Sequence, residues 1–297
     1  MFKLAHISDV HLGPLPAITM RELMSKRITG YVNWQRNRKK HLFGDTLTRL
    51  IEHIRAQAPD HLAITGDLVN LAARTEIDKA QMWLENLGDP QEISVVPGNH
   101  DAYVPRALSR SLKAWRPFLT ADGAPLSETP QFPYLRVRGP VALIGCSTAH
   151  ATPPFSANGT FGPNQAERTR QLLKEAGERG LFRVVLIHHP PVRGAASNYK
   201  RMTGIRRFGK MLREVGAELV LHGHTHLNTV YHLEGRDGPV PVVGIASASQ
   251  GQGGRKPPAG YNLFSISGEA GNWQLTRERF AMEGDDGAFI LAQSDKL

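Results

Sequence analysis

The sequence predicts an α/β fold built around parallel strands, for three reasons. Short runs rich in Val, Ile and Leu recur along the 297 residues, as expected for strands buried on both faces of a sheet. Segments with apolar residues at helical spacing separate several of these runs. Finally, four of five clusters of metal-ligating residue types directly follow an apolar run, and ligands bind where such strands end. The clusters are Asp9-Val10-His11, Gly66-Asp67, Gly98-Asn99-His100-Asp101, His188-His189-Pro190 and Gly223-His224-Thr225-His226.

The strands expected before position 222 are short, apolar runs. Most of them end at a polar cluster, which places that cluster at the carboxyl end of a strand. Arg138-Gly139-Pro140 favours a hairpin between two of them. The predicted strands are Phe2–Ser8, His61–Thr65, Ile93–Val96, Tyr134–Val137, Val141–Cys146, Val184–Ile187 and Leu219–Leu221.

Helices are expected between these strands. In the first, Asp45 is expected to act as the N-cap, apolar residues recur every three or four positions, and Pro59 ends the helix. Positions 103–133 contain Pro and Gly with little periodicity, which predicts a loosely helical insertion. The further predicted helices are Thr75–Leu87, Pro163–Gly177 and Arg206–Val215.

From position 229 onward, four apolar runs separated by Gly-rich turns predict successive strands. They are Thr229–Leu233, Val240–Ile245, Tyr261–Ile266 and Trp273–Phe280. The tail over 281–297 has no clear assignment. Because no linker composition divides the chain, a single domain over 1–297 is predicted.

Composition bounds the class of protein. Hydrophobic residues make up 40% of the chain and charged residues 21%, which is ordinary for a globular protein. Cys146 is the one cysteine, so no internal disulfide can form, and a free cysteine of this kind is usually buried. The strand at Phe2 leaves no room for a signal segment, and no run approaches the ~20 apolar residues of a membrane span. We therefore expect a cytoplasmic protein, soluble or attached peripherally to a membrane.

The chain is strongly basic, with a net charge of +9, which suits a phosphorylated substrate, nucleic acid or an anionic membrane surface. Much of this charge is local. Between positions 21 and 40 the only acidic residue is Glu22, and the basic residues there are Arg21, Lys26, Arg27, Arg36, Arg38, Lys39 and Lys40.

The polar clusters have the residue types of a site for two cations. Asp9 and His11 are two positions apart at the end of a strand, so in an extended segment both side chains point the same way. The carboxylate of Asp67 has two oxygens and can bridge two metals, which an imidazole cannot. Oxygen and nitrogen ligands without sulfur favour Mn, Fe or Zn over soft metals.

Together the clusters form the ordered pattern D-x-H, G-D, G-N-H-[DE], H-x-P and G-H-x-H. This pattern resembles that of the calcineurin-like metallophosphoesterases, and it spans positions 9 to 226. The resemblance implies a sandwich of two β-sheets flanked by helices, with a dimetal site at the carboxyl ends of the strands. The four strands from position 229 onward would form the second, mixed sheet.

The resemblance also implies the ligands of each metal. One metal takes Asp9, His11, Asp67 and His226, and the other takes Asp67, Asn99, His188 and His224. Two such cations clamp the attacking and departing oxygens of an in-line displacement, and a hydroxide held between them attacks phosphorus. His100 lies where the family places the general acid. Asp101 either orients His100 or has a structural role in its loop.

The compact His188 cluster followed by Gly-His-Thr-His is most similar to the bacterial phosphodiesterase branch. A phosphodiesterase acting on a nucleotide-type small molecule is therefore the leading hypothesis. The alternative is a pyrophosphohydrolase of a nucleotide-linked lipid precursor, of the UDP-diacylglucosamine type, at the membrane surface. A distant alternative is a non-catalytic binding scaffold, although every ligand position of the pattern is filled.

The main departure from a compact phosphodiesterase is the segment from Gly13 to Phe43, which mixes apolar and basic residues directly after His11. Four interpretations stay open. The segment is a lid whose apolar face holds a lipid or base, a basic amphipathic helix on an anionic membrane, or a surface on which Tyr31 and Trp34 stack against nucleic acid. The fourth is a helix packed on the core with its charges solvated. Nucleic acid has the least support of the four.

Overall fold

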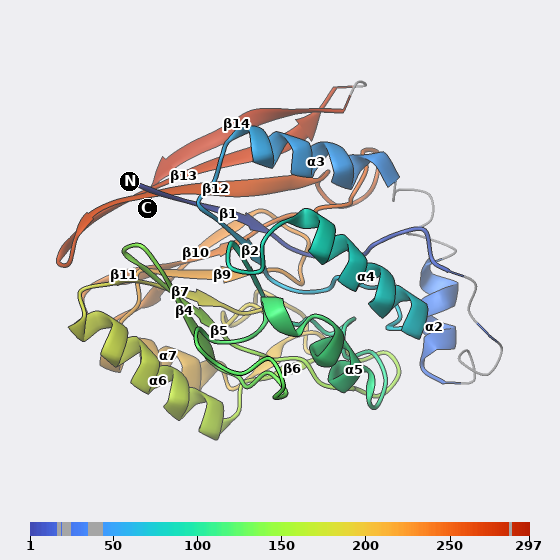
Figure 1. Cartoon of the computed structure of the whole chain (residues 1–297), viewed down its shortest axis with the longest axis horizontal. Coiled ribbons are helices and arrows are strands. Elements are labelled where there is room, and N and C mark those ends of the chain that lie inside the picture. The colour runs from blue at the N-terminus through green and yellow to red at the C-terminus, as the bar shows by residue number, and fades with distance from the viewer. Residues whose placement is uncertain (17–18, 20–24, 35–43, 285–286) are drawn as a thin grey trace.

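Two six-stranded β-sheets pack face to face, and helices cover their outer faces (Figure 1). This arrangement is that of a computed structural model, which describes residues 1–16, 19, 25–34, 44–284 and 287–297. The predicted α/β sandwich of two sheets flanked by helices is confirmed. A small third sheet pairs β6 (Gly159–Thr160) with β8 (Met202–Thr203).

The first sheet has the order β14-β13-β12-β1-β2-β3. Its three N-terminal strands are parallel to one another, and β12 runs antiparallel to β1. Its members are β1 (Phe2–Ile7), β2 (His61–Ile64), β3 (Ile93–Val95), β12 (Gly260–Glu269), β13 (Asn272–Glu283) and β14 (Ala288–Lys296).

The second sheet has the order β10-β11-β9-β7-β5-β4. Its four central strands are parallel, and an antiparallel strand closes each edge. Its members are β4 (Tyr134–Arg138), β5 (Val141–Gly145), β7 (Phe182–Leu186), β9 (Leu219–His222), β10 (Thr229–Glu234) and β11 (Pro239–Gly244). The hairpin predicted at Gly139-Pro140 is the β4–β5 pair.

The parallel strands read as continuous apolar runs because each is covered on both faces. In β1, Leu4 faces the second sheet, whereas Ala5 and Ile7 face the layer of helices α3 and α4. All three side chains are fully buried. A third cluster, which includes Val185, packs the second sheet against α6 and α7. The core therefore has three layers, one between the sheets and one on each outer face.

The prediction that the four late strands form one sheet is wrong. β10 and β11 extend the second sheet, whereas β12 and β13 pair onto β1 in the first. The unassigned tail forms β14, which pairs antiparallel with β13 at the sheet edge. Local periodicity predicted each strand, but it did not reveal that β12 pairs with β1 at the other end of the chain, where Ile266 lies opposite Phe2.

The helices lie close to their predicted positions, with one correction. They are α2 (Arg27–Asn33), α3 (Gly44–Ala56), α4 (Arg74–Leu87), α5 (Ala107–Ala114), η2 (Arg116–Phe118), α6 (Pro163–Glu178) and α7 (Ile205–Val215). Because α3 begins at Gly44, Asp45 lies inside the first turn and is not the N-cap. Its carboxylate pairs with Arg49, with Oδ2 2.7 Å from Nη2, and a negative charge in the first turn also suits the helix dipole.

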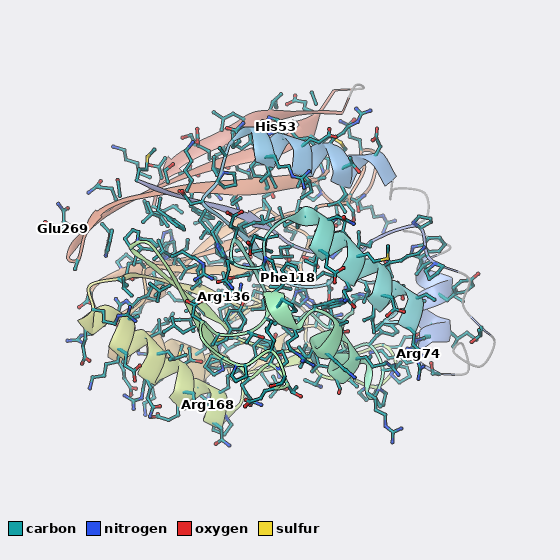
Figure 2. All side chains as sticks on the ribbon, viewed as in Figure 1. His53, Arg74, Phe118, Arg136, Arg168 and Glu269 are labelled. Carbon is teal, nitrogen blue, oxygen red and sulfur yellow. The ribbon has the colours of Figure 1, made fainter. Side chains whose placement is uncertain are left out.

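Arg136 on β4 fixes the loosely helical region around α5 and η2, and Figure 2 shows it near Phe118 of η2. The side chain is only 2% exposed, and its guanidinium donates to the carbonyl oxygens of Pro90, Ile93, Pro117 and Thr120 at 2.5–2.8 Å. These bonds satisfy a buried charge. They also join the insertion to the start of β3.

Within the 13–43 segment, α2 packs on the body of the protein. Arg27 and Trp34 are 7% and 8% exposed, so the structure does not present Trp34 as a stacking surface. Among the basic residues expected to be solvated here, Lys26 and Arg27 are engaged in contacts with the body. Arg21, Arg36, Arg38, Lys39 and Lys40 lie outside the described residues. Across the described ranges, no helix is long and apolar enough to cross a membrane.

Candidate metal centre

The predicted ligands converge where parallel strands of both sheets end. Asp9 and His11 follow β1, Asp67 follows β2, and Asn99 follows β3 of the first sheet. Two residue groups come from the second sheet: His188 follows β7, and the loop with His224 and His226 follows β9. Figure 1 shows β1 running from the N-terminus toward the side of the molecule where α2 lies. Both sheets therefore present their carboxyl ends to one site.

One group of ligand atoms gathers around Asp9. His226 Nε2 lies 3.1 Å from Asp9 Oδ1, and His11 Nε2 lies 3.9 Å from the same oxygen. The two imidazoles approach each other at 3.4 Å, Nε2 to Nε2. Asp67 joins this group because its Oδ2 is 3.9 Å from His11 Nε2.

A second group gathers on the other side of Asp67. His188 Nε2 lies 3.4 Å from Asp67 Oδ2 and 3.2 Å from Asn99 Oδ1. His224 Nδ1 lies 2.8 Å from the same Asn99 oxygen. Asp67 Oδ2 is thus close to an imidazole of each group, which is the position of a bridging carboxylate. All seven predicted ligands are brought together.

Hydrogen bonds to backbone carbonyls orient three of the imidazoles. His11 Nδ1 donates to Val69 O at 3.1 Å and His188 Nδ1 donates to Thr65 O at 2.6 Å, while His224 uses its other nitrogen, Nε2, to donate to Lys200 O at 2.8 Å. A carbonyl can only accept, so these nitrogens carry the proton in the neutral ring. The remaining nitrogen of each ring then points a lone pair into the site, as metal-ligating histidines do.

These lone pairs face other acceptors, which is the strongest sign that the site suits cations. His224 Nδ1 and His188 Nε2 both face Asn99 Oδ1, and His11 Nε2 faces His226 Nε2. Asp9 Oδ1 is buried, and within the described part of the chain no donor meets it with hydrogen-bond geometry, although His226 Nε2 lies 3.1 Å away. Acceptors this close repel unless a proton or a cation lies between them. The donor set is oxygen and nitrogen, so it fits Mn, Fe or Zn.

The charged groups of the site lower the pKa values of its two acids, so these carboxylates are ionised, as metal binding requires. Burial alone would raise the pKa of Asp9 and Asp67, but His226 near Asp9 and His188 near Asp67 outweigh it and lower both. Burial would lower the pKa of His188, yet the Asp67 and Asp9 carboxylates raise it to about 9 in the metal-free site. In the metal-free site His188 therefore carries a second proton, which a metal ion has to displace when it binds.

The local backbone differs from the extended conformation expected from the two-residue spacing. Asp9, His11, Asp67, His224 and His226 have φ values of 52°, 42°, 56°, 67° and 53°. The left-handed region is uncommon for such residues and is typical of functional sites. The side chains do face one site as expected, but tight turns after the strands direct them there.

Two glycines allow the ligand loops to approach closely. A Cβ on Gly223 would lie 1.8 Å from Ser8 Oγ, and a Cβ on Gly98 would lie 2.2 Å from Asp67 Oδ1. The expected role of Gly223 in a close approach is confirmed.

His100 lies beside the ligands but is held by a separate contact. Its backbone N–H donates to Asp67 Oδ1 at 2.7 Å, and its Nδ1 donates to Asn70 O at 2.5 Å. A ligand atom of His100 lies within 4.8 Å of those of His11 and Asp67. Since Nδ1 is used by the carbonyl, Nε2 is the nitrogen that can exchange a proton with a substrate.

Of the two roles left open for Asp101, orienting His100 or a structural role in its loop, the hydrogen bonds of its carboxylate fit the structural one. Its carboxylate is fully buried and accepts hydrogen bonds from the backbone N–H groups of Gly98, Asp67, Leu68 and Val69, at 2.7–3.3 Å. It therefore joins the loop after β3 to the loop after β2, and so fixes the backbone that carries Asn99 and Asp67.

The motifs did not reveal several residues that border the site. Glu76 and Arg27 hold the loop after β2, and Tyr103 stacks on His100 with ring centroids 5.4 Å apart. Lys256 Nζ donates at 2.9 Å to the carbonyl of Thr225, between two predicted ligands. No sequence signal pointed to this contact.

Comparison with known proteins agrees with the fold and with this site. The chain belongs to the calcineurin-like phosphoesterase family, which matches residues 2–228. The resemblance inferred from the motifs is thus confirmed. Membership implies a metal-dependent phosphoester hydrolase.

Solved structures support the fold. A dimetal phosphatase from Danio rerio is similar, with a TM-score of 0.64 and 14% identity over 99% of this chain and 98% of that chain. A purple acid phosphatase from yellow lupin (Lupinus luteus) seeds has a TM-score of 0.61 and 12% identity, over 99% of this chain and 53% of that chain. No curated protein matches closely enough to be compared.

Proposed function

We propose that the chain is a dimetal phosphodiesterase that cleaves a phosphodiester of a nucleotide-type small molecule. The observation that supports it best is the position of Asp67 Oδ2, 3.9 Å from His11 Nε2 and 3.4 Å from His188 Nε2. One carboxylate oxygen between two sets of acceptors that face one another suits two cations that share a ligand.

The residues divide into two ligand sets. Asp9, His11, Asp67 and His226 would hold one metal ion, and the second would be held by Asp67 together with Asn99, His188 and His224. When bound, two such ions supply Lewis acidity and lower the pKa of a coordinated water. The chain itself holds these ligands in fixed loops, through the Asp101 hydrogen bonds and the left-handed turns. Positioning of this kind is most of what a phosphoryl-transfer enzyme contributes.

We assign the leaving-group proton to His100. Nδ1 is fixed on Asn70 O, so Nε2 can donate a proton only when the ring carries a second one. Replacement of His100 by Ala is expected to leave two metals bound and to lower kcat about 10²–10⁴-fold on an alkoxide leaving group. Loss on a p-nitrophenolate leaving group should be much smaller, because that group departs without a proton. An equal loss on both leaving groups would remove the acid role.

Two lysines suit an anionic substrate. Lys256 contacts the Thr225 carbonyl, and the carbonyl of Lys200 accepts the hydrogen bond from His224. Both residues are exposed. Their ammonium groups therefore extend from segments that touch the ligand loop after β9, where a phosphate beyond the scissile bond would benefit from positive charge.

The alternative is a pyrophosphohydrolase of a nucleotide-linked lipid. It is favoured by the exposure of two apolar side chains on α2, Ile28 at 54% and Val32 at 41%. A helix with an exposed apolar face near the site suits an acyl chain or a membrane surface.

A substrate panel tests the proposal. Rates would be measured on a phosphomonoester, a linear diester, 2′,3′- and 3′,5′-cyclic nucleotides and a UDP-linked lipid, each with Mn, Fe and Zn. Preference for a diester supports the phosphodiesterase, and preference for the UDP-linked lipid supports the alternative. Absence of hydrolysis with every metal would reject both and favour a non-catalytic scaffold.

A further inference from the structure

Helix α2 contacts three of the loops that surround the predicted metal centre. Arg27, its first residue, contacts the loop after β2, and Lys26, the residue before it, contacts Tyr103 in the loop after β3. Through Lys26 it reaches the segment that contains Thr152 and Ser156. We infer that α2 positions His100 by means of Lys26 and Arg27. This role rests on the proposed function only insofar as His100 acts in catalysis.

Arg27 holds the loop after β2 from one side. It is 7% exposed, and its guanidinium donates from Nε to Leu71 O at 3.0 Å and from Nη2 to Ala72 O at 2.7 Å. A buried guanidinium bonded to two adjacent carbonyls fixes the orientation of both peptide groups, because its donors have a rigid fork geometry.

Glu76 holds the same loop from the other side. Its carboxylate is 3% exposed and accepts hydrogen bonds from the backbone N–H groups of Asn70 and Ala73 at 2.9 Å each, and from Leu71 at 3.1 Å. Residues 70–73 are thus held by two buried charges. The carboxylate of Glu76 accepts from their N–H groups, and the guanidinium of Arg27 donates to their carbonyl oxygens.

The clamped loop is the one that holds His100. Asn70 donates its N–H to Glu76, and its carbonyl accepts from His100 Nδ1 at 2.5 Å. The Asn70 carbonyl therefore sets the position of the His100 ring, and Arg27 fixes the peptide groups that follow Asn70. Movement of this loop would move the imidazole relative to the metal ligands.

Lys26 supports the His100 ring through Tyr103. The Tyr103 ring is stacked on His100 at 5.4 Å with an interplanar angle of 21°, and Lys26 Nζ lies 4.8 Å from the Tyr103 centroid. The ammonium group is itself fixed by Thr152 Oγ1 at 2.6 Å and Ser156 O at 2.8 Å. A cation at this distance from a ring is attracted to its face, so Tyr103 is held between Lys26 and His100.

Gly30 explains how α2 comes this close. A Cβ at this position would lie 2.4 Å from Leu71 Cδ2 and 2.4 Å from the Tyr103 hydroxyl. Only glycine allows the helix backbone to rest on both loops. α2 is thus packed against the support of His100, and a misplacement of about 1 Å in a catalytic group can lower the rate about 10²-fold.

The test uses Lys26→Met and Arg27→Met, with Lys26→Arg and Arg27→Lys as conservative variants. Lys79→Ala is the control, because Lys79 is exposed on α4 and lies outside the contacts described above. For diesters with p-nitrophenolate and alkoxide leaving groups, we expect each Met variant to lower kcat about 10- to 100-fold on the alkoxide substrate. KM and metal content should stay within about twofold of wild type, the conservative variants should recover part of the rate, and the control should not change.

A double-mutant cycle with His100→Ala separates positioning from a merely structural role. In the His100→Ala background, Lys26→Met and Arg27→Met should have no further effect on kcat, because their effect passes through the missing ring. Additive losses, or a lower unfolding temperature with unchanged kcat, would overturn the inference.

A second readout does not depend on activity. In the metal-free protein, the His100 Nδ1–H proton should give a protected signal in ¹H–¹⁵N spectra, which the Met variants lose and Lys79→Ala keeps. A signal that persists in the Met variants overturns the inference. If the wild-type protein hydrolyses neither diester, the proposed function fails, and the ring signal alone decides whether α2 positions His100.

Discussion

Asp101 shows how a single side chain can support a metal site without touching metal or substrate. Its two oxygens accept four backbone N–H groups from the loops after β2 and β3. Those loops carry Asp67 and Asn99. A carboxylate is suited to this role because both of its oxygens accept, whereas an amide would offer one oxygen and bring a donor toward N–H groups.

We therefore predict that Asp101→Asn weakens metal binding about 10- to 100-fold. Activity at saturating metal should recover most of the wild-type rate, because His100 is supported elsewhere. Metal titrations followed by calorimetry and by rate measure the effect. Asp122→Asn is the control, since that carboxylate is exposed and pairs with Arg138. A rate loss that saturating metal does not correct would show that Asp101 acts on His100 after all.

At the scale of single residues, the sequence predicted the ligands but not the contacts that hold them. Asp9, Asp67 and His188 could be named because their motifs have fixed spacing and resemble a known family. The left-handed turns at these ligands could not be predicted, since Asp and His seldom adopt them. The role of Asp101 depends on N–H groups more than thirty residues away, and no local pattern records such a contact.

The pairing of β2 with β3 buries a histidine that should make folding sensitive to acid. His61 is 1% exposed, and its Nε2 lies 2.8 Å from Ser94 Oγ, whereas its buried Nδ1 has no hydrogen-bond partner among the described residues. Burial, helped by the nearby Arg138 and Arg136, lowers the pKa of His61 to about 3. The unfolded chain keeps a pKa near 6.5, so below that pH it binds a proton that the folded protein does not.

The resulting loss of stability begins near pH 6.5 and grows as the pH falls toward 3. Between pH 7 and pH 5 it amounts to about 2 kcal/mol of unfolding free energy. We predict that His61→Gln reduces the difference in stability between these two pH values by about that amount, as measured by urea unfolding. His232→Gln, at an exposed position on β10, should leave the difference unchanged. A wild-type pH dependence in His61→Gln would show that His61 is protonated within the folded protein.

At the scale of elements, periodicity located strands and helices but not their partners. The runs at β1, β2 and β7 were found because a strand covered on both faces is apolar throughout. The division of β10–β11 and β12–β13 between two sheets could not be predicted, because sequence alternation does not record which edge a strand joins. The helical start at Gly44 was missed because Asp45 suits the first turn as well as the cap.

The net charge of +9 is a property of the whole molecule, and it suits binding to an anionic membrane surface. Peripheral attachment through the 13–43 segment stays a prediction. We expect the protein to pellet with anionic vesicles, and Ile28→Ser with Val32→Ser to weaken this binding at least about tenfold, because two partly exposed apolar side chains are lost. Neutral vesicles are the control. Equal pelleting of wild type and variant would exclude α2 as the contact.

The two-sheet sandwich explains why residues from position 9 to position 226 meet. Each sheet contains a set of parallel strands, β1 to β3 at one side of the first sheet and β11, β9, β7 and β5 in the centre of the second, and the ligand loops follow the carboxyl ends of these strands. Five separate loops are thereby placed around one point, which no single loop could achieve. The proposed sharing of Asp67 by two cations rests on its location between His11 of the first sheet and His188 of the second.

This arrangement can be tested with a crystal structure of the protein with Mn²⁺, in which anomalous differences are measured at the Mn absorption edge. We predict two peaks, one among Asp9, His11 and His226 and one among Asn99, His188 and His224, with the Asp67 carboxylate touching both. In Asp67→Ala crystals at least one of these peaks should disappear. A single peak in the wild-type protein, or two peaks that do not share Asp67, would show that this site does not hold the proposed pair of metals.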